Sequence, residues 1–94
     1  MLLTIAIPTF NRASFLETNL SYLLSQYQNN FNIIVQDNAS TDNTENIIEK
    51  YIELGLPVKY EKNSKNLGWA RNFELCFKKN QTKYIMVISD DDYI

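Results

Sequence analysis

Four short apolar runs alternate with three segments of helical periodicity, and this alternation limits the fold more than any other feature. The runs are expected to be strands and cover Leu2 to Pro8, Phe31 to Gln36, Val58 to Glu61 and Tyr84 to Ile88. The first run is apolar at nearly every residue, which is typical of a strand covered on both faces. Strand–helix–strand repeats with right-handed crossovers give a parallel sheet with helices on both faces. We therefore predict an α/β fold around a parallel sheet of about four strands.

The segments between the strands carry apolar residues at helical spacing. The first helix is expected to begin at a capping box formed by Ser14 and Glu17. Its apolar face comprises Leu16, Leu20, Leu23, Leu24 and Tyr27. The second helix, capped by Asp42 with Glu45 and stopped at Gly55, is expected to bury Ile47, Ile48, Tyr51 and Ile52. The third helix places Trp69, Phe73, Cys76 and Phe77 on one face.

Length, charge and cysteine content exclude several classes of protein. With 94 residues, positions 1–94 can form one small domain. The net charge of -2 gives a polyanion no electrostatic attraction, which argues against a nucleic-acid partner. Cys76 is the single cysteine, so no internal disulfide can form and a reducing compartment is expected. The N-terminus lacks a basic region, and no stretch approaches the roughly 20 apolar residues of a membrane span, so we expect a cytoplasmic protein.

Polar residues cluster after three of the expected strands. The clusters are Thr9 to Arg12, Asp37 to Ser40 and Asp90 to Asp92. In open parallel sheets ligands bind outside the carboxyl ends of the strands, so the fold would bring these clusters to one edge. That convergence predicts a binding site there.

The composition of these clusters restricts the ligand. Glycine-rich phosphate loops are absent, because the chain contains only Gly55 and Gly68. The chain has no histidine, so a metal ion would have to be held by oxygen ligands, which suits Mg²⁺ or Mn²⁺. Three adjacent aspartates repel one another, and a bound divalent cation that bridges phosphate oxygens would relieve that repulsion.

Five pieces of the sequence, in order, carry a resemblance to a known family. They are Ile5-Ala6-Ile7-Pro8-Thr9-Phe10-Asn11-Arg12, Ser25-Gln26, Ile34-Val35-Gln36-Asp37-Asn38-Ala39-Ser40-Thr41-Asp42, Asn66-Leu67-Gly68 with Ala70-Arg71-Asn72, and Tyr84-Ile85-Met86-Val87-Ile88-Ser89-Asp90-Asp91-Asp92. With these pieces the chain resembles family 2 glycosyltransferases of the Rossmann-like GT-A fold over essentially its whole length. It looks like the nucleotide-sugar-binding half of such an enzyme.

The resemblance implies a role for each matching position. Residues Pro8, Thr9, Phe10 and Asn11 would line the nucleotide pocket, with Thr9 or Phe10 near the base and ribose and with Arg12 as a further candidate. Asp37 matches a base-recognising acidic residue, and Asn38 stands where a second aspartate is common. The segment packing beside the nucleotide would contribute Asn66, Gly68 and Arg71.

The aspartate run resembles the D-x-D motif that coordinates a metal ion and a diphosphate. Two alignments remain open, because the acidic positions fall either on Ser89 and Asp91 or on Asp90 and Asp92. We expect Asp91 to be the metal ligand, Asp92 to be the second candidate and Asp90 to lie toward the ribose. The implied cofactor is Mn²⁺ or Mg²⁺, and the implied ligand is a UDP-, GDP- or dTDP-sugar.

The activity expected from this resemblance is glycosyl transfer to an acceptor in polysaccharide or glycan biosynthesis. The family's acceptor site and catalytic carboxylate base lie beyond the D-x-D motif, so we expect the base beyond Ile94 and no transfer by residues 1–94 alone. The alternative is a non-catalytic nucleotide- or metal-binding or interaction module. A receiver-like signalling domain is disfavoured, because the loop from Pro8 to Arg12 lacks an acidic pair.

The last expected strand also predicts an association. The segment from Tyr84 to Ile88 carries no charge and no proline, as an unprotected sheet edge would. We therefore expect a homodimer across this edge.

Overall fold

A computed structural model describes residues 3–78, 82 and 84–88, which form a parallel sheet with helices on both faces. The elements in chain order are β1 (Leu3–Thr9), α1 (Ala13–Gln26), β2 (Asn32–Asp37), α2 (Thr44–Glu53), β3 (Val58–Lys62), α3 (Trp69–Lys78) and β4 (Tyr84–Val87). The strand order is β3-β2-β1-β4, and each neighbouring pair is parallel. The α/β fold and the four expected strands are thus confirmed. Most of the strand ends differ from the prediction by one residue.

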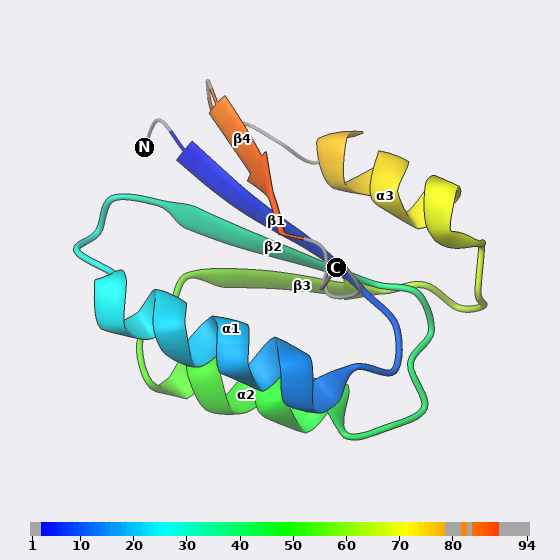
Figure 1. The fold of residues 1–94 in the computed structure, drawn as a ribbon, viewed down its shortest axis with the longest axis horizontal. Helices are drawn as coiled ribbons and strands as arrows, with labels where there is room; N and C mark the ends of the chain where they lie inside the picture. Colours follow the sequence, from blue (N-terminus) through cyan, green and yellow to red (C-terminus); the bar gives the residue numbers. More distant parts are fainter. Residues whose placement is uncertain (1–2, 79–81, 83, 89–94) are drawn as a thin grey trace.

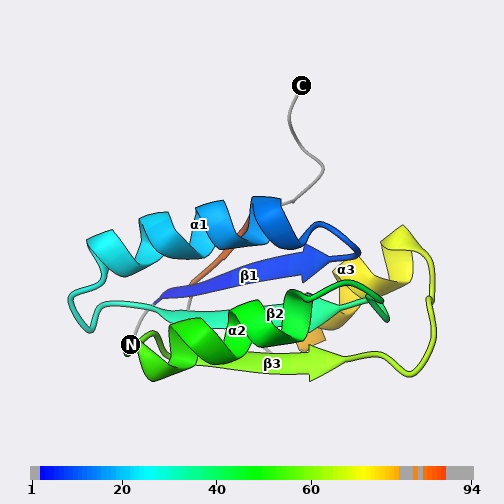
Figure 2. The ribbon, with the colours of Figure 1, turned by 90° about the horizontal axis from the view of Figure 1, so that it is seen from below.

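The helices divide between the two faces of the sheet. Helices α1 and α2 lie side by side on one face, whereas α3 lies on the other (Figures 1 and 2). The chain adds β2 and β3 on one side of β1 and then returns to add β4 on the other side. Because parallel crossovers are right-handed, this reversal of direction moves the connecting helix to the opposite face. The reversal also creates a switch point beside β1, where ligands bind in open parallel sheets.

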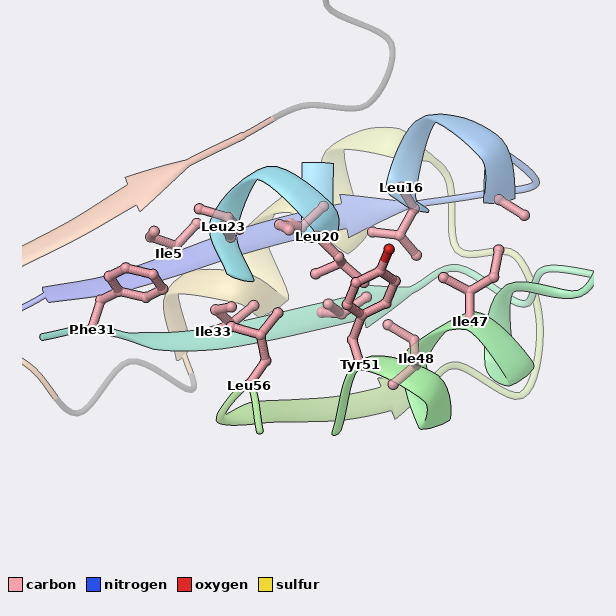
Figure 3. Packing of buried hydrophobic residues seen from close by; sticks show 13 residues of the cluster. Ile5, Leu16, Leu20, Leu23, Phe31, Ile33, Ile47, Ile48, Tyr51 and Leu56 are labelled. Atoms are coloured by element: carbon pink, nitrogen blue, oxygen red, sulfur yellow. The ribbon is translucent and has the colours of Figure 1, made fainter. Parts of the chain in front are cut away.

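The hydrophobic core lies between the sheet and the pair α1 and α2 (Figure 3). Alternate residues of the two central strands point into it, as the period of two requires. Its members are Ile5, Ile7, Ala13, Leu16, Leu20, Leu23, Phe31, Ile33, Val35, Ile47, Ile48, Tyr51 and Leu56. The predicted face of α1 is confirmed in Leu16, Leu20 and Leu23, which are all buried. In α2 the prediction for Ile52 was wrong, since its side chain is 45% exposed and Leu56 fills the core instead.

The face of the sheet under α3 mixes apolar and polar buried residues, such as Ala6, Ile34 and Gln36. The buried residues of α3 are Asn72 and Cys76. Asn72 donates its Nδ2 to the backbone oxygen of Gln36 at 2.9 Å, which ties α3 to β2. The expected apolar face of this helix is confirmed in Cys76, which is buried, but it was wrong for Trp69 and Phe77, which are 61% and 44% exposed. The hydrogen bond from Asn72 to Gln36 turns the Asn72 side of the helix toward the sheet and leaves the two ends of the aromatic stripe exposed.

The start of α1 differs from the predicted capping box. The helix begins at Ala13, so Ser14 lies within the first turn, and the N-cap residue Arg12 makes no side-chain cap bond. The backbone N–H of Ala13 instead donates to Asp42 Oδ2 at 3.1 Å, so a distant loop caps this helix. Glu17 pairs with Lys50 of α2 at 2.7 Å, an exposed ion pair that links the two helices.

The end of α2 follows the prediction at Gly55. The N–H of Gly55 donates to Ile52 O at 3.1 Å, and the N–H of Leu56 donates to Tyr51 O at 3.1 Å. These two bonds form a Schellman motif, in which Gly55 takes a φ of 108° that glycine adopts without a Cβ penalty.

β3 and β4 form the two edges of the described sheet. The position of β4 at an edge agrees with the expectation from its sequence, and the homodimer across it stays a prediction. In the described part of the chain, each helix is too short or too polar to cross a bilayer.

Candidate functional site

The loops that follow β1, β2 and β3 meet at one edge of the sheet. Thr9 at the end of β1 is in register with Asp37 at the end of β2, and Asp37 is in register with Lys62 at the end of β3. On the other side of β1, Ile88 donates its N–H to Ala6 O at 2.9 Å, two residues before Asp90 in the sequence. The predicted convergence is therefore confirmed for the first two polar clusters. Asp90, Asp91 and Asp92 lie outside the described residues.

Asn11 joins the loop after β1 to the loop after β2. Its backbone N–H donates to Ser40 Oγ at 2.9 Å. Its side-chain Oδ1 accepts the backbone N–H of Thr41 at 2.7 Å and that of Asp42 at 3.3 Å. Asn11 has a φ of 50°, a left-handed conformation that asparagine tolerates better than most residues. These bonds fix the shape of the loop that contains the expected pocket residues.

Asp42 holds the same two loops together and caps two helices. Its Oδ2 accepts the N–H of Ala13 at the start of α1, and its Oδ1 accepts the N–H and the hydroxyl of Thr44 at the start of α2. Partial desolvation acts to raise the pKa of Asp42. The hydrogen bonds from the Thr44 hydroxyl and from the backbone N–H groups of Ala13 and Thr44 outweigh it, so the pKa lies below its ordinary value of 3.8.

Asp37 is fully buried beneath these loops, at 0% exposure. Its Oδ1 accepts the backbone N–H of Ser40 at 2.9 Å and the Ser40 hydroxyl at 2.6 Å. Its Oδ2 accepts the hydroxyl of Tyr60 at 2.5 Å. A direct contact between Asp37 and a base, as the resemblance implies, would require the carboxylate to exchange one of these bonds.

Asn38 belongs to a network of side-chain amides at the ends of β2 and β3. Its Nδ2 donates to Asn66 Oδ1 at 2.9 Å, and its Oδ1 accepts the N–H of Leu67 at 2.8 Å and Nδ2 of Asn63 at 3.1 Å. The same Asn63 amide donates to Asn72 Oδ1 at 2.7 Å, which extends the network into α3. The candidate residues Asn38 and Asn66 are therefore brought together, and the loop between β3 and α3 is anchored to β2.

Gly68 ends this loop and begins α3. Its N–H donates to Asn66 Oδ1 at 2.7 Å, and its backbone oxygen accepts the N–H of Asn72 at 3.2 Å. Its φ of 89° is a backbone conformation that glycine adopts without a Cβ penalty. A shallow hollow beside Gly68 is lined by Leu67, Gly68, Trp69, Ala70, Arg71 and Glu74. Arg71 is therefore exposed to solvent next to the amide network.

The remaining pocket candidates lie at the end of β1. Pro8 and Thr9 are buried, and Phe10 is 41% exposed. The guanidinium carbon of Arg12 lies 5.8 Å from the centroid of the Phe15 ring, within the range of a cation–π contact. Arg12 therefore lies over α1.

Sequence reasoning gave no role in this region to Tyr60 and Asn63, and it named Ser40 and Asn72 only as members of a polar cluster or of the pieces that carry the resemblance. A signal existed for Tyr60. It pairs in register with Val35, and the period of two along β2 places Val35 and Asp37 on the same face of the sheet. No comparable signal existed for Asn63, and its contact with Asn72 depends on the position of α3 against β2.

Comparison with known proteins assigns the chain to a family. Residues 4–94 match the model described as Glycosyl transferase family 2. The chain belongs to this family. The abequosyltransferase RfbV of Salmonella typhimurium is 37% identical over 95 residues, which cover 98% of this chain and 28% of RfbV. The chain thus spans less than a third of this relative's length.

Solved structures share the fold of this family 2 chain. The crystal structure of S. aureus TarS 1-349 in complex with UDP-GlcNAc matches with a TM-score of 0.85 and 28% identity, over 100% of this chain and 28% of that one. The mannosyltransferase PcManGT from Pyrobaculum calidifontis, in complex with GDP-Man and Mn2+, matches with a TM-score of 0.78 over 95% of this chain and 27% of its own. At 19% identity, the second match shows the fold alone. The chain therefore has the GT-A arrangement expected from its sequence.

Candidate metal ligands were sought among the described residues. Within residues 3–78, 82 and 84–88, no group of three carboxylate or thiol side chains is gathered that could coordinate an ion. The candidate ligands Asp91 and Asp92 offer only oxygen donors. The single thiol, that of Cys76 in α3, is buried. Such a donor set suits a hard divalent cation.

Ala39, between Asn38 and Ser40, has a φ of 69°, which is strained for a residue with a Cβ. We expect Ala39→Gly to raise the free energy of unfolding by about 0.5–1 kcal/mol, because glycine reaches this conformation without that strain. Urea denaturation of the two proteins measures the difference. The matched control is Gly55→Ala, which should lower stability by a similar amount, since a Cβ at Gly55 meets no atom within 4 Å and only its φ is at stake. A loss of stability in Ala39→Gly would contradict the prediction.

Proposed function

We propose that the chain is the donor-binding region of a glycosyltransferase that binds a nucleoside diphosphate sugar through a divalent metal ion. The whole protein would transfer the sugar to an acceptor in polysaccharide or glycan biosynthesis. The observation that carries the proposal is the convergence of the loops after β1, β2 and β3 at one edge of the sheet, in a chain of family 2. The match to TarS in complex with UDP-GlcNAc supports a uridine nucleotide as the first ligand to test.

The pocket in this proposal is formed by two loops and the start of α3. Residues Pro8 to Arg12 would line one side, and their loop is held in place through Asn11 and Ser40. The turn around Asn66 and Gly68 would line the other side, with Arg71 contributing positive charge toward the diphosphate. Asn38 connects the two sides, because it bonds to Thr9 through its backbone and to Asn66 through its side chain.

The metal ion would be held by Asp91 with Asp92, and Asp90 would lie toward the ribose. Ile88 is the last described residue before this run, and its backbone bond to Ala6 supports a position beside β1. A divalent cation in such a site neutralises charge on the diphosphate and so helps it to depart. Mn²⁺ and Mg²⁺ both accept carboxylate oxygens of this kind.

Calorimetric titration tests the metal dependence. We expect the chain to bind UDP, GDP or dTDP in the presence of MnCl₂ and to lose at least tenfold in affinity when EDTA replaces the metal. Asp91→Ala should bind the nucleotide equally with and without Mn²⁺, because it lacks the expected ligand. The matched control is Glu53→Ala, which removes an exposed carboxylate at the end of α2, away from the carboxyl edge of the sheet. Equal affinity of the unmutated chain with and without metal would contradict the proposal.

A further inference from the structure

The buried carboxylate of Asp37 is placed to act on the pocket without touching a ligand. It is 0% exposed, and its three hydrogen-bond donors are the backbone and hydroxyl of Ser40 and the hydroxyl of Tyr60. Burying an ionised carboxylate is costly unless it is hydrogen-bonded, and charge-assisted bonds of this kind are the strong ones. Asp37 therefore fixes its neighbours firmly.

A continuous chain of hydrogen bonds runs from β3 to the loop after β1. Tyr60 donates to Asp37, Asp37 accepts the Ser40 hydroxyl, and Ser40 Oγ in turn accepts the backbone N–H of Asn11 at 2.9 Å. The direction of each bond is determined, because a backbone N–H can only donate and an ionised carboxylate can only accept. The bonds from Asn11 to Ser40 and from Ser40 to Asp37 run in one direction and therefore polarise one another, whereas Tyr60 donates to the same carboxylate from its other oxygen and holds it in place.

The surroundings of the Tyr60 hydroxyl keep it protonated. Desolvation and the hydrogen bond to Asp37 both raise the pKa of Tyr60 far above its ordinary value of 10.0. The hydroxyl therefore remains a hydrogen-bond donor to the Asp37 carboxylate.

We propose that Asp37 is a positioning residue, which Tyr60 holds in place and which shapes the nucleotide pocket through Ser40 and Asn11. The proposal rests on the proposed function, and it replaces a direct contact between Asp37 and the base with an indirect effect. Oδ1 already accepts two hydrogen bonds, which fills its capacity, and Oδ2 faces the Tyr60 hydroxyl inside the protein.

The two roles of Asp37 give opposite results in Ser40→Ala. This variant keeps the Asp37 carboxylate but removes the hydroxyl that links it to Asn11. For a positioning role, we expect the amide hydrogen of Asn11 to exchange with solvent at least tenfold faster by NMR, and the affinity for UDP with Mn²⁺ to fall several-fold. For a direct contact, Ser40→Ala would keep its affinity and Asp37→Asn alone would lose it.

Two further variants complete the test. Tyr60→Phe keeps the ring but removes the bond to Oδ2, and it should also speed the exchange of Asn11 and weaken UDP binding. The double variant Asp37→Asn with Ser40→Ala should bind UDP no more weakly than Ser40→Ala alone, since one interruption already breaks the chain. Ser40→Ala and Tyr60→Phe decide the matter even where Asp37→Asn does not fold.

Matched controls on α1 separate the chain of bonds from general effects. Tyr22→Phe removes an exposed hydroxyl, and Ser25→Ala removes a hydroxyl that bonds only within its own helix turn. Both should leave the exchange of Asn11 and the affinity for UDP unchanged. Unchanged exchange of Asn11 in Ser40→Ala would overturn the positioning role. Failure of the unmutated chain to bind any nucleotide would contradict the proposed function instead, so the two failures are distinguishable.

Discussion

Leu20→Ala is expected to lower the free energy of unfolding by about 3 kcal/mol, the largest effect of any single substitution considered for this chain. Leu20 of α1 is 0% exposed and lies in the core between the sheet and the helix pair (Figure 3). Removing its side chain loses the transfer free energy of the buried atoms and leaves a cavity that the surrounding strands and helices fill only in part. Chemical denaturation followed by circular dichroism measures the change.

Tyr22→Ala is the matched control for this substitution. Tyr22 lies in the same helix but is 65% exposed, so its removal should change the free energy of unfolding by less than about 0.5 kcal/mol. A loss below about 1 kcal/mol for Leu20→Ala, or equal losses for both variants, would show that α1 does not pack on the sheet as described.

Asp42→Ala is expected to lower the free energy of unfolding by about 2 kcal/mol, because one carboxylate caps two helices. An N-cap side chain is worth about 1 kcal/mol, and Asp42 accepts backbone N–H groups at the start of both α1 and α2. The negative charge also interacts favourably with the positive ends of both helix dipoles. The same variant should weaken nucleotide binding, since it removes the bond by which the Asp42 carboxylate ties the loop after β2 to Ala13, at the end of the loop after β1.

The pH dependence of stability provides a second measurement for Asp42. Its pKa is lower in the folded protein than the ordinary value of 3.8, so its stabilising effect is complete above about pH 4 and is lost as the pH falls through the folded pKa. The difference in stability between the unmutated chain and Asp42→Asn should therefore shrink below about pH 4. Glu45→Ala, a control one residue after Thr44 on the exposed side of α2, should cost less than Asp42→Ala. Equal losses in these two variants would contradict the double cap.

Most of the fold could be predicted from sequence pattern. The four strands, the leucine face of α1 and the stop at Gly55 follow from local periodicity and from the freedom of glycine at positive φ. The convergence of Thr9 and Asp37 followed from the rule that carboxyl ends of parallel strands share an edge. The wrong predictions concern Ser14, which does not cap α1, and Ile52, Trp69 and Phe77, which are exposed because their helices bury other residues.

The sequence alone determined the class of fold, the edge of the sheet where polar residues gather and the resemblance to family 2, because strand and helix periods and short motifs are local properties. Only the tertiary structure decided that Asp42 caps two helices, that Asp37 is enclosed by Ser40 and Tyr60, and that Asn72 rather than Trp69 faces the sheet. Asp42 and Ala13 are 29 residues apart, as are Ser40 and Asn11, and Tyr60 is 23 residues from Asp37. Such partners meet only after the strands have paired, and a buried carboxylate or amide then takes the donors that the packed chain brings within reach.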